Sequence, residues 1–90
     1  MKQMLRFQVS LFGPTAIATP KGSAFKHFDY QHSRGAYSAW FECPAAEDTI
    51  ADEHRILKIV GTGVAYHGKY LGSAQMPDGS TMFHLIEVMS

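Results

Sequence analysis

The segment 55–63, Arg-Ile-Leu-Lys-Ile-Val-Gly-Thr-Gly, is the feature that most limits what this chain can fold into. Its isoleucines and valine are β-branched, which favours a strand over a helix. Because side chains alternate along a strand, Leu57 and Ile59 point to one face while Ile56 and Val60 point to the other. The segment therefore predicts a central strand that is covered on both faces, and its two glycines predict a bulge or turn where the strand ends.

Alternating segments with turn signals between them surround this strand. The expected strands are 4–12, 16–19, 24–32, 37–43, 70–76 and 81–89, and the turns lie at 13–14, 20–22, 33–36 and 77–80. This spacing is typical of an all-β domain, and we predict a small sandwich or partly open barrel of about six or seven antiparallel strands. In the strand 24–32, alternation places Phe28 and Tyr30 on one face and Phe25 on the other. The acidic segment 44–53 is predicted to be an exposed loop, in which we allow one short helical turn.

Composition narrows the class of protein further. The 90 residues predict a single domain over 1–90, and eight basic residues balance eight acidic ones. A neutral chain argues against a broad phosphate-binding face, so extended nucleic-acid binding is not expected. The lone cysteine, Cys43, excludes an intrachain disulfide and is expected to be a small packed side chain. No apolar run approaches the ~20 residues that span a bilayer, and the first residues do not resemble a signal peptide, so we expect no membrane association and a cytoplasmic location.

The strands that are apolar on both faces also bear on assembly. Besides 55–60, the segment 81–89 places Phe83 and Leu85 on one face and Ile86 on the other. A chain of this length has little material with which to cover both faces of a sheet. Either the sheet closes on itself or a second copy covers one face, and we predict a homodimer.

The histidines suggest a metal site only weakly. His27 and Asp29 share a face of their predicted strand, and they would need a third ligand from a neighbouring strand. There is no His-Glu-x-x-His or Cys-x-x-Cys motif. His84, between Phe83 and Leu85, is interpreted as a half-buried histidine with a fixed hydrogen-bond partner. No serine lies in a nucleophile-elbow motif, so we expect neither an enzyme nor a cofactor.

Two loops carry side chains that suit a small anionic ligand. Tyr66, His67, Lys69 and Tyr70 combine aromatic rings and a cation around a glycine, a set that can stack on a ring and pair with a phosphate. Arg34, at the tip of the predicted hairpin 33–36, has the planar fork that binds carboxylate or phosphate. These five residues are the predicted ligand contacts.

Several motifs also resemble a family of small all-β domains encoded by bacteriophages and bacteria. They are Thr19-Pro-Lys-Gly-Ser, Tyr37-Ser-Ala-Trp-Phe-Glu, Ile59-Val-Gly-Thr-Gly, Tyr70-Leu-Gly-Ser and Met82-Phe-His-Leu-Ile-Glu. The similarity runs from about residue 5 to residue 87. It departs at Val64, where the family usually has histidine, and at Phe83, where it usually has tryptophan.

The resemblance implies phage or prophage origin and an accessory role. We therefore expect a non-enzymatic protein that binds and inhibits or sequesters a host factor, either a host protein or a small signalling nucleotide, in the host cytoplasm. Two alternatives stay open. One is a structural or assembly component of a virion, and the other is a small metal-dependent hydrolase.

Overall fold

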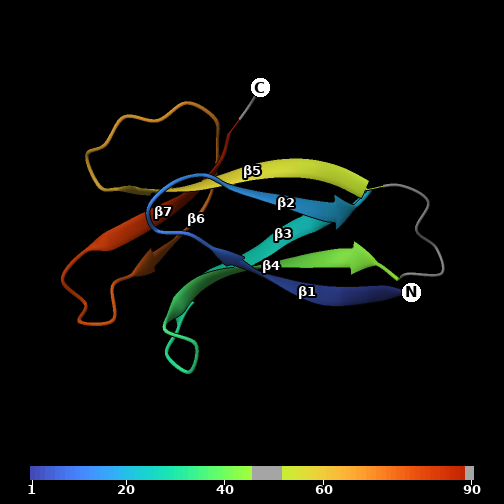
Figure 1. Ribbon diagram of the computed structural model, residues 1–90, viewed down its shortest axis with the longest axis horizontal. Helices are drawn as coiled ribbons and strands as arrows, with labels where there is room; N and C mark the ends of the chain where they lie inside the picture. The colour runs from blue at the N-terminus through green and yellow to red at the C-terminus, as the bar shows by residue number, and fades with distance from the viewer. Residues whose placement is uncertain (46–51, 89–90) are drawn as a thin grey trace.

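The described part of the chain, residues 1–45 and 52–88 of this computed structural model, consists of strands in two antiparallel sheets (Figure 1). The strands are β1 (Lys2–Val9), β2 (Thr15–Pro20), β3 (Ala24–Gln31), β4 (Ala36–Pro44), β5 (Asp52–Gly61), β6 (Lys69–Gln75) and β7 (Met82–Glu87). One sheet has the order β1-β4-β3 and the other β2-β5-β7-β6. The predicted all-β class is therefore confirmed, as a small sandwich whose sheets do not close into a barrel.

Glycines at positive φ form the two tight hairpins that the sequence predicts. Gly35 has φ of 63° between β3 and β4, and Gly79 has φ of 75° between β6 and β7. Both angles are in the left-handed region, where a residue without Cβ is favoured. The backbone N–H of Gly79 also donates to the Met76 carbonyl across 2.8 Å. These turns fix the β3–β4 and β6–β7 pairings.

The segment 55–60 lies inside a sheet, as predicted, because β5 runs between β2 and β7. Leu57 and Ile59 are buried between the two sheets, and Val60 is buried on the outer face. The prediction of burial on both faces is wrong for Ile56, which is 42% exposed. Ile56 lies opposite the small side chain of Ala16 in β2, whereas Val60 lies opposite the larger ring of His84 in β7.

Phe41 on β4 is the centre of the core. It is fully buried, and its ring meets Phe7 and Phe25 edge-on, with ring centroids 5.8 and 5.7 Å apart. Such edge-to-face contacts add about 0.5–1.5 kcal/mol each beyond the apolar area that they bury. Leu57 and Leu85 of the other sheet are fully buried in the same cluster.

A β-bulge corrects the predicted faces of β3. The register of β3 against β4 shifts between Phe25 and His27. One extra residue at that point reverses the alternation, so Phe25 faces the core together with Phe28 instead of lying on the opposite face of the strand. A second irregularity, between Tyr70 and Gly72 of β6, lies near it in space, because a Cβ on Gly72 would be 3.2 Å from the Phe25 ring. The two bulged strands meet at this side of the sandwich.

The predicted loop 44–53 is shorter than expected at both ends. Pro44 is the last residue of β4, and Asp52 and Glu53 begin β5, where they lie opposite Pro20 and Thr19 of β2. The ladder with β2 therefore extends the central strand into the acidic segment. The expected helical turn and the rest of the loop, residues 46–51, lie outside the described residues.

Candidate functional site: a cavity beneath the β5–β6 loop

A long loop, 62–68, joins β5 to β6 (Figure 1). It borders a cavity of about 260 Å³ on the outer face of the four-stranded sheet, which we call the loop cavity. It is lined by Val60, Gly61, Thr62, Gly63, Val64, Tyr66, Tyr70 and His84. Tyr66 and Tyr70 are about half exposed, at 52% and 50%. The cavity therefore combines aromatic rings that solvent still reaches with a wall of strand residues.

A chain of hydrogen bonds fixes the polar side of the loop cavity. Nδ1 of His84 lies 2.7 Å from Oγ of Ser73, and Nε2 lies 2.9 Å from Oγ1 of Thr62. The Ser73 hydroxyl also meets the Tyr70 hydroxyl at 2.5 Å. The interpretation of His84 as a half-buried histidine with a fixed partner is confirmed, and it has one partner at each ring nitrogen. The chain orients the Tyr70 ring at the cavity mouth.

The Ser73–His84 contact resembles a nucleophile and its base, but its surroundings differ from a catalytic triad. The second nitrogen of His84 meets the hydroxyl of Thr62, whereas a triad histidine is oriented by a carboxylate. A hydroxyl can donate or accept, so it does not select one tautomer of the ring. Ser73 also shares its hydroxyl with Tyr70. The arrangement holds the His84 ring and the Tyr70 hydroxyl in place.

Two further cavities share a tyrosine with the loop cavity. Tyr70 and Lys69 line a cavity of about 420 Å³ together with Arg55 and Glu87, which we call the edge cavity. Tyr66 and His67 line one of about 440 Å³ over Ile56, Val60 and Ile86, which we call the outer-face cavity. The structure thus brings Tyr66 and Tyr70 into one site, with Lys69 and His67 on its two sides.

The fifth predicted contact, Arg34, lies elsewhere, in the hairpin between β3 and β4. It lines none of the cavities that contain Tyr66, Lys69 or Tyr70. Its neighbours Gly35 and Ala36 line a different cavity, of about 460 Å³, beneath the β1–β2 turn. A role for Arg34 beside the tyrosines remains a prediction.

The weak metal candidates form a pair with each other on the opposite sheet. Nε2 of His27 lies 3.5 Å from Oδ2 of Asp29, and both side chains are more than half exposed. The His27 ring also packs on Trp40, with centroids 5.4 Å apart. Within residues 1–45 and 52–88, no three His, Cys, Asp or Glu side chains gather closely enough to hold a metal ion.

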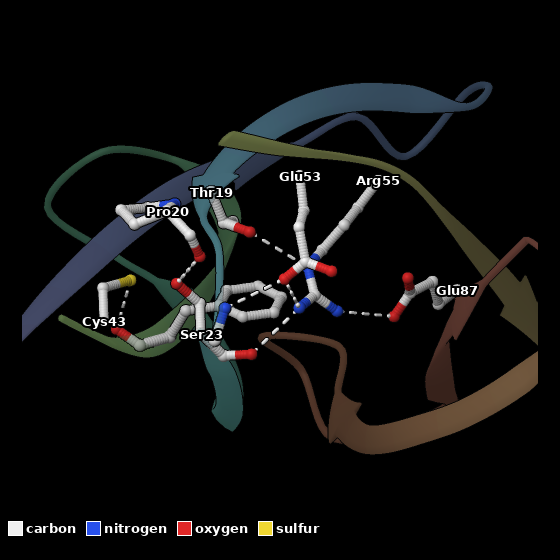
Figure 2. Close-up of polar contacts among 9 residues, drawn as sticks. Thr19, Pro20, Ser23, Cys43, Glu53, Arg55 and Glu87 are labelled. Carbon is white, nitrogen blue, oxygen red and sulfur yellow. Dashed lines mark hydrogen bonds and ion pairs between the residues drawn. The ribbon is translucent and has the colours of Figure 1, made fainter. Parts of the chain in front are cut away.

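A second polar cluster, around Arg55, was not anticipated from the sequence (Figure 2). The Arg55 guanidinium donates to the Thr19 hydroxyl (3.0 Å), the Ser23 carbonyl (2.9 Å) and the Glu87 carboxylate (3.0 Å). Its central carbon lies 5.3 Å from the centroid of the Phe41 ring. These contacts join β2, β5 and β7 to the turn before β3 and to the core. Because they occupy the guanidinium, we assign Arg55 a structural role.

Sequence spacing gave no signal for this cluster, since Arg55 lies 36 residues from Thr19 and 32 from Glu87. Figure 2 also shows Cys43, which is fully buried, with its thiol 3.6 Å from the Phe41 carbonyl. Its predicted role as a small packed side chain is confirmed. In the described part of the chain, no helix is long and apolar enough to cross a membrane.

The fold and site together define a small β-sandwich domain with a tyrosine-walled cavity beside one of its sheets. The chain belongs to a family described as a domain of unknown function, DUF7352, whose sequence profile matches residues 1–90. No curated protein and no solved structure matches the chain.

Proposed function

We propose that this protein is a non-catalytic binding protein that sequesters a small anionic ring compound, of the class of signalling nucleotides. The role is that of a phage-type accessory protein in the cytoplasm of a bacterial host. The observation that carries the proposal is the loop cavity, with Tyr66 and Tyr70 half exposed at its mouth and His84 held at its wall.

The tyrosines supply the surface on which a planar ring stacks. Aromatic side chains hold bases in this way in many nucleic-acid-binding domains, and each stack is worth about 1–3 kcal/mol. The hydrogen bond between the Ser73 and Tyr70 hydroxyls restrains Tyr70, so less side-chain freedom is lost on binding. At about 260 Å³ the loop cavity is below the ~300–1,000 Å³ of typical sites for drug-sized ligands, so it suits one ring system and leaves the rest of the ligand outside.

The charge beside the cavity favours an anion. Lys69 lies in the edge cavity, which shares Tyr70 with the loop cavity. The other cation there, Arg55, is paired with Glu87 at 3.0 Å, so its charge is largely compensated. Among the described residues Lys69 is in no salt bridge. A phosphate attached to a ring in the loop cavity would therefore meet Lys69 across Tyr70.

The proposal is tested by isothermal titration with a panel of adenine and guanine mononucleotides and the matching nucleosides. Tyr66→Ala and Tyr70→Ala are expected to weaken binding of both kinds of ligand by about 5- to 150-fold, the equivalent of one lost stack. Lys69→Ala is expected to weaken binding of the nucleotides alone. Lys26→Ala, which removes an exposed cation from β3 on the other sheet, is the matched control and should change nothing.

Two results would contradict the proposal. One is that no member of the panel binds. The other is that a nucleotide binds with the same affinity to the two tyrosine variants. Arg34→Ala adds a separate measurement, because a loss equal to that of Lys69→Ala would show that the ligand reaches the β3–β4 hairpin. Equal unfolding temperatures for all variants show that the losses come from binding.

A further inference from the structure

The exposed sheet edges of this protein differ in how they are protected. An open edge can pair with another chain unless charges, bulges or covering elements prevent it. β1 carries Lys2 and Arg6. β3 and β6 each contain a register shift, and they meet where Gly72 packs against Phe25. Among the described residues, β2 has none of these features in its sequence Thr-Ala-Ile-Ala-Thr-Pro, and it pairs with β5 alone.

The ladder shows which backbone groups of β2 are free. The Val88 N–H donates to the Ile56 carbonyl across 2.8 Å, so the backbone groups of Ile56 point toward β7. Backbone groups alternate in direction along a strand, so those of Arg55 point toward β2 and meet its partner there, Ile17. The N–H and C=O groups of Ala16 and Ala18 therefore point away from β5, to the open edge.

The sequence of β2 is also the same in both directions around Ile17. Thr15-Ala16-Ile17-Ala18-Thr19 is a palindrome, so a second copy of β2 related by a two-fold axis through Ile17 presents identical residues. In that register Ala16 lies opposite Ala18 of the second copy, and Ile17 lies opposite its own counterpart. No charged side chain within β2 faces another across the axis.

We infer that β2 pairs antiparallel with β2 of a second copy about a two-fold axis at Ile17. Ala16 and Ala18 of each copy exchange backbone hydrogen bonds, and the two four-stranded sheets join into one. Pro20 also belongs to the set whose backbone points outward, and it has no N–H, so the ladder ends there. The inference does not depend on ligand binding, because the loop cavity contains no residue of β2.

Charge substitutions at the two alanines test the pairing and its register. Both side chains are exposed in the single chain, so the fold tolerates the changes. Ala16→Lys with Ala18→Lys places like charges opposite each other across the axis, as does Ala16→Glu with Ala18→Glu. Ala16→Lys with Ala18→Glu places opposite charges there. Like charges directly opposite on neighbouring strands are destabilising and opposite charges stabilising.

Sedimentation equilibrium at low ionic strength measures the result. The unchanged protein should approach twice the 10.0 kDa mass of one chain as its concentration rises. Both like-charge variants should raise the dissociation constant at least about tenfold, which corresponds to ~1.4 kcal/mol. The Lys/Glu variant should dimerise at least as well as the unchanged protein. Because the like-charge variants have net charges of opposite sign, an equal loss in both excludes a simple effect of net charge.

Three outcomes would overturn the inference. They are a protein that stays monomeric at the highest concentration reached, like-charge variants that still dimerise, and a Lys/Glu variant as weak as the like-charge ones. The last would mean a different register, since pairing Ala16 with its own counterpart places like charges together in every variant. Hydrogen exchange gives a second readout in the unchanged protein. The Ala16 and Ala18 amides should become protected as concentration rises, whereas that of Ile17, which points to β5, should be protected throughout.

Discussion

The Arg55 cluster allows a sharp prediction, because two carboxylates lie near the same guanidinium but differ in their distance from it and in their exposure to solvent. Glu87 lies 3.0 Å from Arg55 with its side chain 20% exposed, whereas Glu53 lies 3.6 Å away and is 44% exposed. Solvent screens the second pair more than the first. We therefore expect Glu87→Ala and Glu53→Ala to have different effects on the free energy of unfolding, although each removes one acidic side chain.

The magnitudes follow from what each substitution leaves behind. Glu87→Ala removes a charge-assisted hydrogen bond in a mostly buried place, which is worth about 1.5–3 kcal/mol. Glu53→Ala removes an exposed ion pair, worth about 0–1 kcal/mol, together with an exposed hydrogen bond from the Gly22 N–H (3.1 Å), which water can replace. Arg55→Ala leaves Glu87 without its cation and the fully buried Thr19 hydroxyl and the Ser23 carbonyl without their donor, so its cost should reach about 3–5 kcal/mol.

Urea unfolding, followed by Trp40 fluorescence, measures the free energy of unfolding of all three variants. The double variants that combine Arg55→Ala with Glu87→Ala or with Glu53→Ala complete two double-mutant cycles. We expect the coupling energy between Arg55 and Glu87 to be about 1.5–3 kcal/mol, and that between Arg55 and Glu53 to be below about 0.5 kcal/mol. Equal costs for Glu87→Ala and Glu53→Ala would refute the argument from burial. A cost below about 1 kcal/mol for Arg55→Ala would show that the cluster does not join the sheets.

Three other measurements address the core and its titration. Leu57→Ala should cost about 2–5 kcal/mol in urea unfolding, because the side chain is fully buried, and a loss below about 1 kcal/mol would contradict its place in the core. Gly72→Ala should destabilise by about 1–3 kcal/mol, since its Cβ would lie 3.2 Å from Phe25, whereas the control Gly61→Ala meets nothing closer than 3.9 Å and should be near neutral. Burial raises the pKa of Tyr37 above its ordinary 10.0, so the folded state favours the neutral phenol. The contribution of this shift to the free energy of unfolding is complete below pH 10.0 and decreases as the pH rises through the folded pKa. Raising the pH through this range should therefore lower the free energy of unfolding of the unchanged protein more than that of Tyr37→Phe. Parallel pH profiles of the two proteins would contradict this.

The sequence predicted the strands well because their signals are local. The pattern around Leu57, and the glycines of the two hairpins, depend on residues that are neighbours in the chain. The burial of His84 was also predicted from its apolar neighbours. Its partners Thr62 and Ser73 could not be named, because strand order decides which side chains meet across β5, β6 and β7.

The errors have equally definite causes. The bulge between Phe25 and His27 has no sequence signature, because an extra residue such as lysine resembles any other strand residue, and it reversed the predicted face of Phe25. Ile56 was predicted to be covered because its own strand is apolar, but it stays 42% exposed although residues of the β5–β6 loop line the same cavity. At the loop cavity, the tyrosines could be recognised as candidates from the sequence, whereas the hydrogen bonds that hold His84 could not be predicted from it.

The contrast between the β2 edge and the other strands sets an upper limit on self-association. Fibrous aggregates grow when each added molecule presents a fresh site for the next. When β2 of one molecule pairs with β2 of a second copy, neither molecule keeps an unprotected sheet edge among the described strands, since β1 carries cations. Concentrated solutions should therefore stop at pairs and stay clear.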